Sequence, residues 1–269
     1  MTTSVSRTLT SNGSRRQTTI SFWYKKCEIG TSRMLFQSYS SGGNNQNLLT
    51  VNDDTLRFGS HVGNSYVINL ITNRKFRDTN AWYHIVYRVD TTQSTASDRI
   101  RCYVNGELLA WDTSHSDHLY PSQSDENYLN SDYPIQINAL NGNGIMDCCM
   151  SHIHFCDGYS YSADSFGSTD STTGEWKINT SPSVTYGTNG FFILKDGNSV
   201  TDQSPNTNNF TVAAGTLTKT EDCPSNVFCT GNPLAIKNSP IFTNGDNTIT
   251  ALGSSPYDVT TLGTLGMSS

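Results

Sequence analysis

Two segments decide the fold of this chain: Trp82-Tyr83-His84-Ile85-Val86-Tyr87-Arg88-Val89-Asp90 and, after a polar loop, Ile100-Arg101-Cys102-Tyr103-Val104-Asn105-Gly106-Glu107-Leu108. In the second segment the apolar side chains at 100, 102 and 104 alternate with Arg101 and Tyr103, which is the period of a half-buried strand. Asn105-Gly106 follows as a hairpin turn, because both residues tolerate positive φ. We therefore predict strands of a β-sandwich that is suited to surface display rather than to chemistry.

Composition limits the class of protein. The chain has 269 residues, enough for one large all-β domain with a core, alone or with an arm. Charged residues make up only 15%, and the abundant Ser, Thr, Asn and Gly favour short strands joined by polar loops. A net charge of −6 argues against a nucleic-acid partner, since such a partner requires a basic surface. No apolar run approaches the roughly 20 residues that span a bilayer, so we expect no membrane insertion.

Short β-rich segments recur at hairpin spacing along the rest of the chain, and no helix of ten residues is expected. They cover residues 20–24, 34–38, 48–51, 55–58, 65–71, 135–138, 146–155, 190–194, 210–212 and 217–218. This pattern predicts an all-β fold, an antiparallel jelly-roll β-sandwich over residues 1–229. Residues 230–269 are polar and carry too little apolar surface to pack alone, so we predict an extended C-terminal arm that becomes ordered against a partner.

Two sets of motifs carry a resemblance to known families. Trp82-Tyr83-His84 and Tyr103-Val104-Asn105-Gly106 are similar, in order and separation, to the laminin G-like and pentraxin branch of concanavalin A-like jelly rolls. A second set resembles marine-virus and phage proteins with this domain: Phe155-Cys156-Asp157-Gly158, Ser165-Phe166-Gly167, Gly174-Glu175-Trp176-Lys177, Tyr186-Gly187-Thr188-Asn189-Gly190-Phe191, Asn208-Asn209-Phe210, Pro224-Ser225-Asn226-Val227-Phe228 and Asn232-Pro233-Leu234. The resemblance covers about residues 5–235 and implies a virion fibre, spike or decoration protein.

The resemblance also implies a function and partners. It favours a non-enzymatic virion structural protein that displays a lectin-like domain. The implied partners are capsid or tail proteins of the same virion, further copies of the chain and a glycan on the host surface. The N-terminal residues 1–7 show no apolar signal region, so we expect synthesis in the host cytoplasm and a final place on the virion surface. A free carbohydrate-binding lectin and, with less support, a glycoside hydrolase stay open as alternatives.

The long polar loop over residues 112–132 and its borders hold the candidate glycan-binding residues. Sugars bind to aromatic faces and to amide or carboxylate groups, and long loops in compact domains are often functional. The candidates are Trp111, Tyr120, Tyr128, Tyr133, Asp117 and Asp125. The alternative, in which the same aromatic side chains close the ends of the sandwich, is favoured, and glycan binding stays open beside it.

Two groups of residues offer metal ligands, although no cofactor is predicted. Asn52-Asp53-Asp54 and the loop over 112–132 carry oxygen ligands suitable for calcium, against a favoured interpretation as solvated turn residues. The other group alternates along a predicted strand and would share one face of it: Met150, His152, His154 and Cys156. Zinc is possible there, but inward packing is favoured, because any strand gives the same spacing to its buried face.

Glycoside hydrolysis on this fold needs two carboxylates that face each other across a cleft. Laminarinase-type relatives place them on one strand in the pattern Glu-x-Asp-x-x-Glu. The glutamates of this chain do not follow that pattern: Glu28, Glu107, Glu126, Glu175 and Glu221. We therefore predict no catalytic residues and a protein that is not an enzyme.

Overall fold

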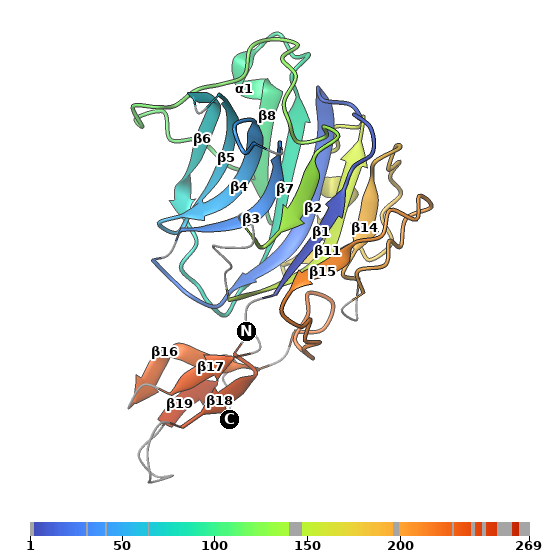
Figure 1. Cartoon of the computed structure of the whole chain (residues 1–269). Coiled ribbons are helices and arrows are strands. Elements are labelled where there is room, and N and C mark those ends of the chain that lie inside the picture. Colours follow the sequence, from blue (N-terminus) through green and yellow to red (C-terminus); the bar gives the residue numbers. More distant parts are fainter. Residues whose placement is uncertain are drawn as a thin grey trace.

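The backbone of the chain is almost entirely β-strand in a computed structural model (Figure 1). The structure describes residues 3–263 except for 31, 41, 64, 140–146, 196–198, 228, 238–239, 244–245 and 252–259. Within these ranges the helices are α1 (Ala96–Arg99) and the single 3-10 turn η1 (Ala163–Ser165). The all-β class predicted from the sequence is confirmed.

Two antiparallel sheets face each other and form a sandwich (Figure 1). In the described part of the chain the first sheet has the order β15-β1-β10-β3-β4-β5-β6 and the second the order β14-β11-β2-β7-β8-β9. The first sheet consists of β1 (Ser4–Thr8), β3 (Arg33–Tyr39), β4 (Gln46–Asn52), β5 (Thr55–Val62), β6 (Ser65–Lys75), β10 (Pro134–Ile137) and β15 (Thr211–Ala214). The second consists of β2 (Gln17–Lys26), β7 (Trp82–Asp90), β8 (Ile100–Val104), β9 (Glu107–Leu108), β11 (Cys148–Asp157) and β14 (Phe191–Ile193). Their inward side chains form one buried core of aliphatic and aromatic residues.

The two segments that decide the fold are neighbouring strands, since β7 pairs antiparallel with β8. Ile100, Cys102 and Val104 are fully buried on one face of β8, as their alternation predicts. The turn after β8 has φ of 50° at Asn105 and 81° at Gly106, which is the left-handed region that these two residue types tolerate. The period-two pattern and the turn motif thus identified this part of the sheet correctly.

A bulge in β11 overturns one prediction. The pairing of β11 with β2 shifts register between Ser151 and His154, and His152 inside the shift has φ of 48°. Met150, before the bulge, packs against the main core, whereas His154 and Cys156, after it, contact a second cluster on the outer side of the sheet. The prediction that four alternating residues share one face was therefore wrong, because an extra residue interrupts the strand period.

The outer side of the second sheet is covered by the segment between β11 and β14. This segment contains the hairpin of β12 (Gly167–Thr169) and β13 (Trp176–Ile178). Phe166 and Ala163 are buried there against Val86 and Cys156 of the sheet, with Trp176 packed at the margin. The sheet therefore has a small second core on the face that points away from the sandwich.

The two ends of the sandwich differ in what they carry (Figure 1). The long loop between β9 and β10 lies at the end where α1 is found, which we call the loop end. The small sheets formed by β16 (Gly231–Lys237) with β19 (Thr260–Gly263), and by β17 (Ile241–Thr243) with β18 (Thr248–Thr250), lie at the opposite end. The predicted arm over 230–269 therefore contains strands of its own in its described part, while the boundary at residue 229 stays a prediction.

A buried ion pair joins the segment before β16 to the second sheet. The Nζ atom of Lys25 lies 2.9 Å from Oδ2 of Asp222 and 3.0 Å from Oγ1 of Thr230. The indole Nε1 of Trp82 donates to the same Asp222 oxygen at 3.0 Å. Lys25 and Asp222 are each only 1% exposed, so this contact is shielded from water and fixes the C-terminal segment against β2 and β7.

Candidate functional site

The loop end presents a pair of tyrosine rings beside an arginine. Tyr128 and Tyr133 are stacked with ring centroids 5.9 Å apart, and the guanidinium of Arg15 lies 5.1 Å from the centroid of Tyr128. Arg15 also pairs with the exposed carboxylate of Glu126 at 3.1 Å. Both rings are half-buried, so each keeps part of its apolar surface in contact with water. This group combines aromatic surface with a charged donor and a charged acceptor, and we call it the tyrosine platform.

A buried carboxylate holds the loops that carry this platform. Asp157, at the end of β11, accepts hydrogen bonds from the backbone N–H of Ser14, the side chain of Asn130 and the backbone N–H of Asn189. The three donors come from three different segments, and Asn130 and Asn189 also bond to each other at 3.0 Å. A carboxylate that accepts several N–H donors is strongly ordered, so the loops on either side of Arg15 and Tyr128 are fixed to the sandwich.

The remaining candidates for glycan binding lie elsewhere on the loop. Tyr120 is half-buried against the core and meets His118 edge to face, with centroids 4.7 Å apart. Asp117 is exposed, and the backbone oxygen of Asp125 accepts a hydrogen bond from Thr91. Trp111 is only 7% exposed and belongs to the main core. The structure thus brings Tyr128 and Tyr133 together, while Trp111 closes the sandwich instead of presenting its face.

The carboxylates of the turn Asn52-Asp53-Asp54, which was considered as a calcium site, pair with cationic side chains of the protein. The Asp54 carboxylate is buried and accepts from the ammonium of Lys26, from the backbone N–H of Gly30 at 2.8 Å and from Nε of Arg77 at 3.1 Å. Burial alone would raise the pKa of Asp54, but these three donors lower it below its usual value. Asp53 pairs with Lys75 at 2.8 Å. Calcium at Asn52-Asp53-Asp54 is therefore not supported, and the interpretation of Asp54 as a solvated turn residue was also wrong, because the carboxylate is the counter-ion of a buried lysine.

Buried histidines line the second core on the outer face. His84 stacks between Trp23 and Trp176, with ring centroids 5.0 and 5.9 Å away, and its Nδ1 accepts from Nε1 of Trp176 at 3.0 Å. An indole N–H can only donate, so His84 carries its proton on Nε2 and donates it to Ser21 at 2.9 Å. Burial lowers the pKa of His84 to about 3, with a smaller contribution from the nearby His152.

His154 belongs to the same cluster. It stacks on Phe192 at 3.9 Å and shares a hydrogen bond of 2.9 Å with the hydroxyl of Tyr186. Burial lowers the pKa of His154 well below its ordinary value. No group of three or more His, Cys, Asp or Glu side chains with metal-binding geometry occurs among the described residues. The histidines therefore act in this structure as neutral packing and hydrogen-bonding groups.

The carboxylates are spread over different segments. Glu28 follows β2 and pairs with Arg33, Glu107 lies in β9 at the edge of the second sheet, and Glu126 is in the long loop. Glu175 and Glu221 are both exposed, in the β12–β13 connection and before β16. In the described part of the chain no two of these glutamates lie on one strand. The laminarinase-type pattern of glutamates along one strand is therefore not found among the described residues.

Reasoning from the sequence missed several residues of these sites. Arg15 lies 113 positions before Tyr128 in the sequence. Asp157, whose carboxylate accepts from the Ser14 N–H, is likewise far from Ser14 in the sequence. Lys26 and Asp54 are likewise separated by 28 positions. The one signal for these sites in the sequence was the basic pair Arg15-Arg16 at the start of a strand. Local sequence patterns do not show which residues these two arginines contact.

The two antiparallel sheets define the class of this protein as a jelly-roll β-sandwich. Neither α1 nor any other helix in the described ranges has the length and apolar character of a membrane-spanning helix. Residues 2–148 match the family described as the concanavalin A-like lectin/glucanases superfamily. Because this match covers more than half of the 269 residues, the chain belongs to that superfamily.

Several solved structures are similar to parts of this chain at low sequence identity. A native heptameric SAP-like pentraxin from Limulus polyphemus is 14% identical, with a TM-score of 0.42, over 60% of this chain and 71% of that one. Domains LG4-5 of the mouse laminin alpha1 chain are 8% identical, with a TM-score of 0.42, over 72% of this chain and 45% of that one. A botulinum neurotoxin type C, whose cell entry depends on two ganglioside molecules, is 14% identical, with a TM-score of 0.39, over 56% and 34%. The comparison with curated proteins finds no match.

Proposed function

We propose that this chain is a non-enzymatic, lectin-like protein of a virion surface that binds a host glycan through its loop end. The observation that carries the proposal is the tyrosine platform of Arg15, Glu126, Tyr128 and Tyr133, held in place by Asp157. Aromatic rings flanked by a charged donor and acceptor are suited to the mixed apolar and polar faces of a sugar. Scattered glutamates support binding without hydrolysis.

The C-terminal segment lies at the end of the sandwich opposite the long loop, and this arrangement supports a role in displaying the loop end on a particle. The strands β16–β19 lie at the end of the sandwich away from the long loop (Figure 1). A protein attached to a particle through this end would direct its loops outward. Many weak sites on one symmetric particle would then bind a glycosylated surface by avidity. A free lectin is the alternative, since the same platform would act without a particle.

Glycan binding is tested with a glycan array probed by the whole chain and by the variant Tyr133→Ala. Tyr133 is chosen because Tyr128 also packs on Arg15 and bonds through its amide to Asn47. We expect binding to a defined glycan class and a loss of about tenfold or more in affinity for the variant. Tyr159→Ala is the matched control, because Tyr159 forms a similar stacked pair with Tyr161 outside the platform. No bound glycan, or an equal loss with Tyr159→Ala, would contradict the proposal.

The virion role is tested independently of sugar binding. Antibodies against this chain are used to label purified virus particles from the source of the sequence in electron micrographs. We expect labels on the particle surface at a regular spacing, and the chain in the protein composition of washed particles. Particles without the chain, combined with specific glycan binding by the free protein, would replace the virion proposal by the free lectin.

A further inference from the structure

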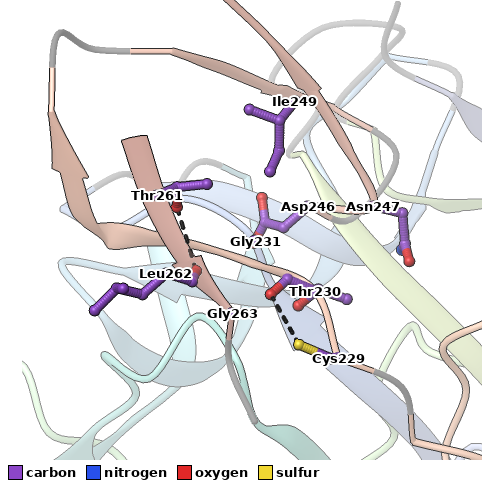
Figure 2. A pocket seen from close by; sticks show the side chains of 9 residues that line it. All are labelled: Cys229, Thr230, Gly231, Asp246, Asn247, Ile249, Thr261, Leu262 and Gly263. Atoms are coloured by element: carbon purple, nitrogen blue, oxygen red, sulfur yellow. Dashed lines mark hydrogen bonds between the residues drawn. The ribbon is translucent and has the colours of Figure 1, made fainter. Parts of the chain in front are cut away.

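The C-terminal sheets form an open pocket that contains a buried acid. The pocket has a volume of about 350 Å³ and lies between β16, β18 and β19. Figure 2 shows the Asp246 carboxylate pointing into this group of side chains, between Ile249 and Thr261. Asp246 is only 1% exposed, and its φ of 64° is held by a hydrogen bond from the Gly231 N–H to the Asp246 carbonyl oxygen.

Both carboxylate oxygens of Asp246 lack a hydrogen-bond partner among the residues that the structure describes. A buried carboxylate without hydrogen-bond donors raises the free energy of the folded state, because it has lost its hydrogen bonds to water and has formed none with the protein. Lys25, whose charge acts on Asp246, already bonds to Asp222 and Thr230. The pocket therefore has an acceptor pair that is complementary to a donor from outside this part of the chain.

The rim of the pocket carries two exposed apolar side chains among polar ones. Ile249 is 42% exposed and Leu262 is 67% exposed, although both are large hydrophobic side chains. A ligand that joins an aliphatic stem to a cationic head would cover this rim and reach the carboxylate at the same time. A divalent cation fits less well, because calcium requires six or more oxygen ligands and the described residues contain no cluster of acidic, histidine or cysteine ligands.

We propose that this pocket binds an arginine side chain of a partner polypeptide, with the guanidinium in two parallel hydrogen bonds to Asp246 and the stem against Ile249 and Leu262. Two unpartnered oxygens match the planar fork of a guanidinium better than the single point charge of an ammonium. Arginine is also the cation most often used in buried ion pairs between proteins. This inference does not depend on sugar binding, since it concerns the opposite end of the molecule.

The charges around Asp246 make the binding sensitive to pH. Burial raises the pKa of Asp246 to about 7; Lys25 of β2 counteracts this, whereas Asp147 before β11 and Asp222 before β16 add to it. Cys27, at the end of β2, also faces this carboxylate. A guanidinium requires the ionised acid, so we expect its affinity to rise about tenfold between pH 6 and pH 8.

The test uses the whole chain and Nα-acetyl-arginine methylamide as the probe, followed by shifts of backbone amide NMR signals. We expect saturable shifts at Gly231, Ile249 and Leu262 with a dissociation constant in the millimolar range. The neutral isostere Nα-acetyl-citrulline methylamide should bind at least tenfold more weakly, and without the dependence on pH. Equal binding of arginine and citrulline would overturn the proposal, and this comparison needs no variant.

A pair of variants adds a second test. Asp246→Asn keeps the shape of the side chain and should weaken arginine binding at least tenfold, whereas Glu221→Gln, at an exposed acid before β16, should leave it unchanged. Retained binding by Asp246→Asn would overturn the assignment. Sedimentation of the unmodified chain distinguishes the source of the arginine. Self-association that Asp246→Asn abolishes would identify a second copy, and a monomer that binds the probe would identify another protein.

Discussion

Replacement of Asp54 by asparagine should lower the free energy of unfolding by about 3–5 kcal/mol, the usual cost of removing one partner from a buried ion pair. Lys26 is fully buried and Asp54 only 2% exposed, so the ammonium would be left in a site from which water is excluded. Asparagine has a similar shape and tolerates the φ of 66° at this position, so the loss reports the charge rather than backbone strain. Urea unfolding at pH 7 measures the effect.

The neighbouring residue provides the control. Asp53 also has positive φ and also forms an ion pair, but Asp53 and Lys75 are both exposed. Asp53→Asn should therefore change the free energy of unfolding by less than about 1 kcal/mol. Adding Lys26→Met to Asp54→Asn should restore most of the lost stability, because it removes the unpaired buried charge. Similar losses for Asp53→Asn and Asp54→Asn would refute the assigned role of Lys26.

The strands of this fold could be predicted because their signals are local. Alternating burial at Ile100, Cys102 and Val104 needs only a few residues, and Asn105-Gly106 defines its own turn. The bulge at His152 could not be predicted, because nothing in its neighbours distinguishes a continued strand from one with an extra residue. Local patterns therefore located many strands of the two large sheets, but not the bulge in β11 or the hairpin of β12 and β13.

The sites depended on contacts between distant segments, and they were predicted only in part. Tyr128 and Tyr133 were chosen as aromatic residues in a polar loop and do lie together, but Arg15 was not foreseen. Asp54 has the sequence context of a solvated turn, and only the fold places it against Lys26. A side chain of given type can be a surface group or a buried counter-ion, and the sequence alone does not choose between them.

The stability of the protein should fall as the pH is lowered from 7 to 5, in part because of the buried histidines. The pKa of His84 is lowered to about 3 and that of His154 is also strongly lowered, whereas an unfolded histidine titrates near 6.5. Between these values the unfolded state binds more protons than the folded state, so protonation favours unfolding as the pH falls. His84 should contribute a loss of about 2 kcal/mol between pH 7 and pH 5, and His154 a loss in the same direction, with this stability fully present above pH 6.5.

Variants isolate this contribution from other groups that titrate. Asp246 acts with the opposite sign, because its raised pKa makes the folded state bind the extra proton over part of the same range. The measured quantity is therefore a difference: the loss of stability between pH 7 and pH 5 should be about 2 kcal/mol smaller in His84→Gln than in the unmodified chain. His84→Gln should also be less stable at pH 7, since it loses its contacts with Trp23 and Trp176. An equal loss in His84→Gln and the unmodified chain would mean that His84 does not resist protonation in the folded state.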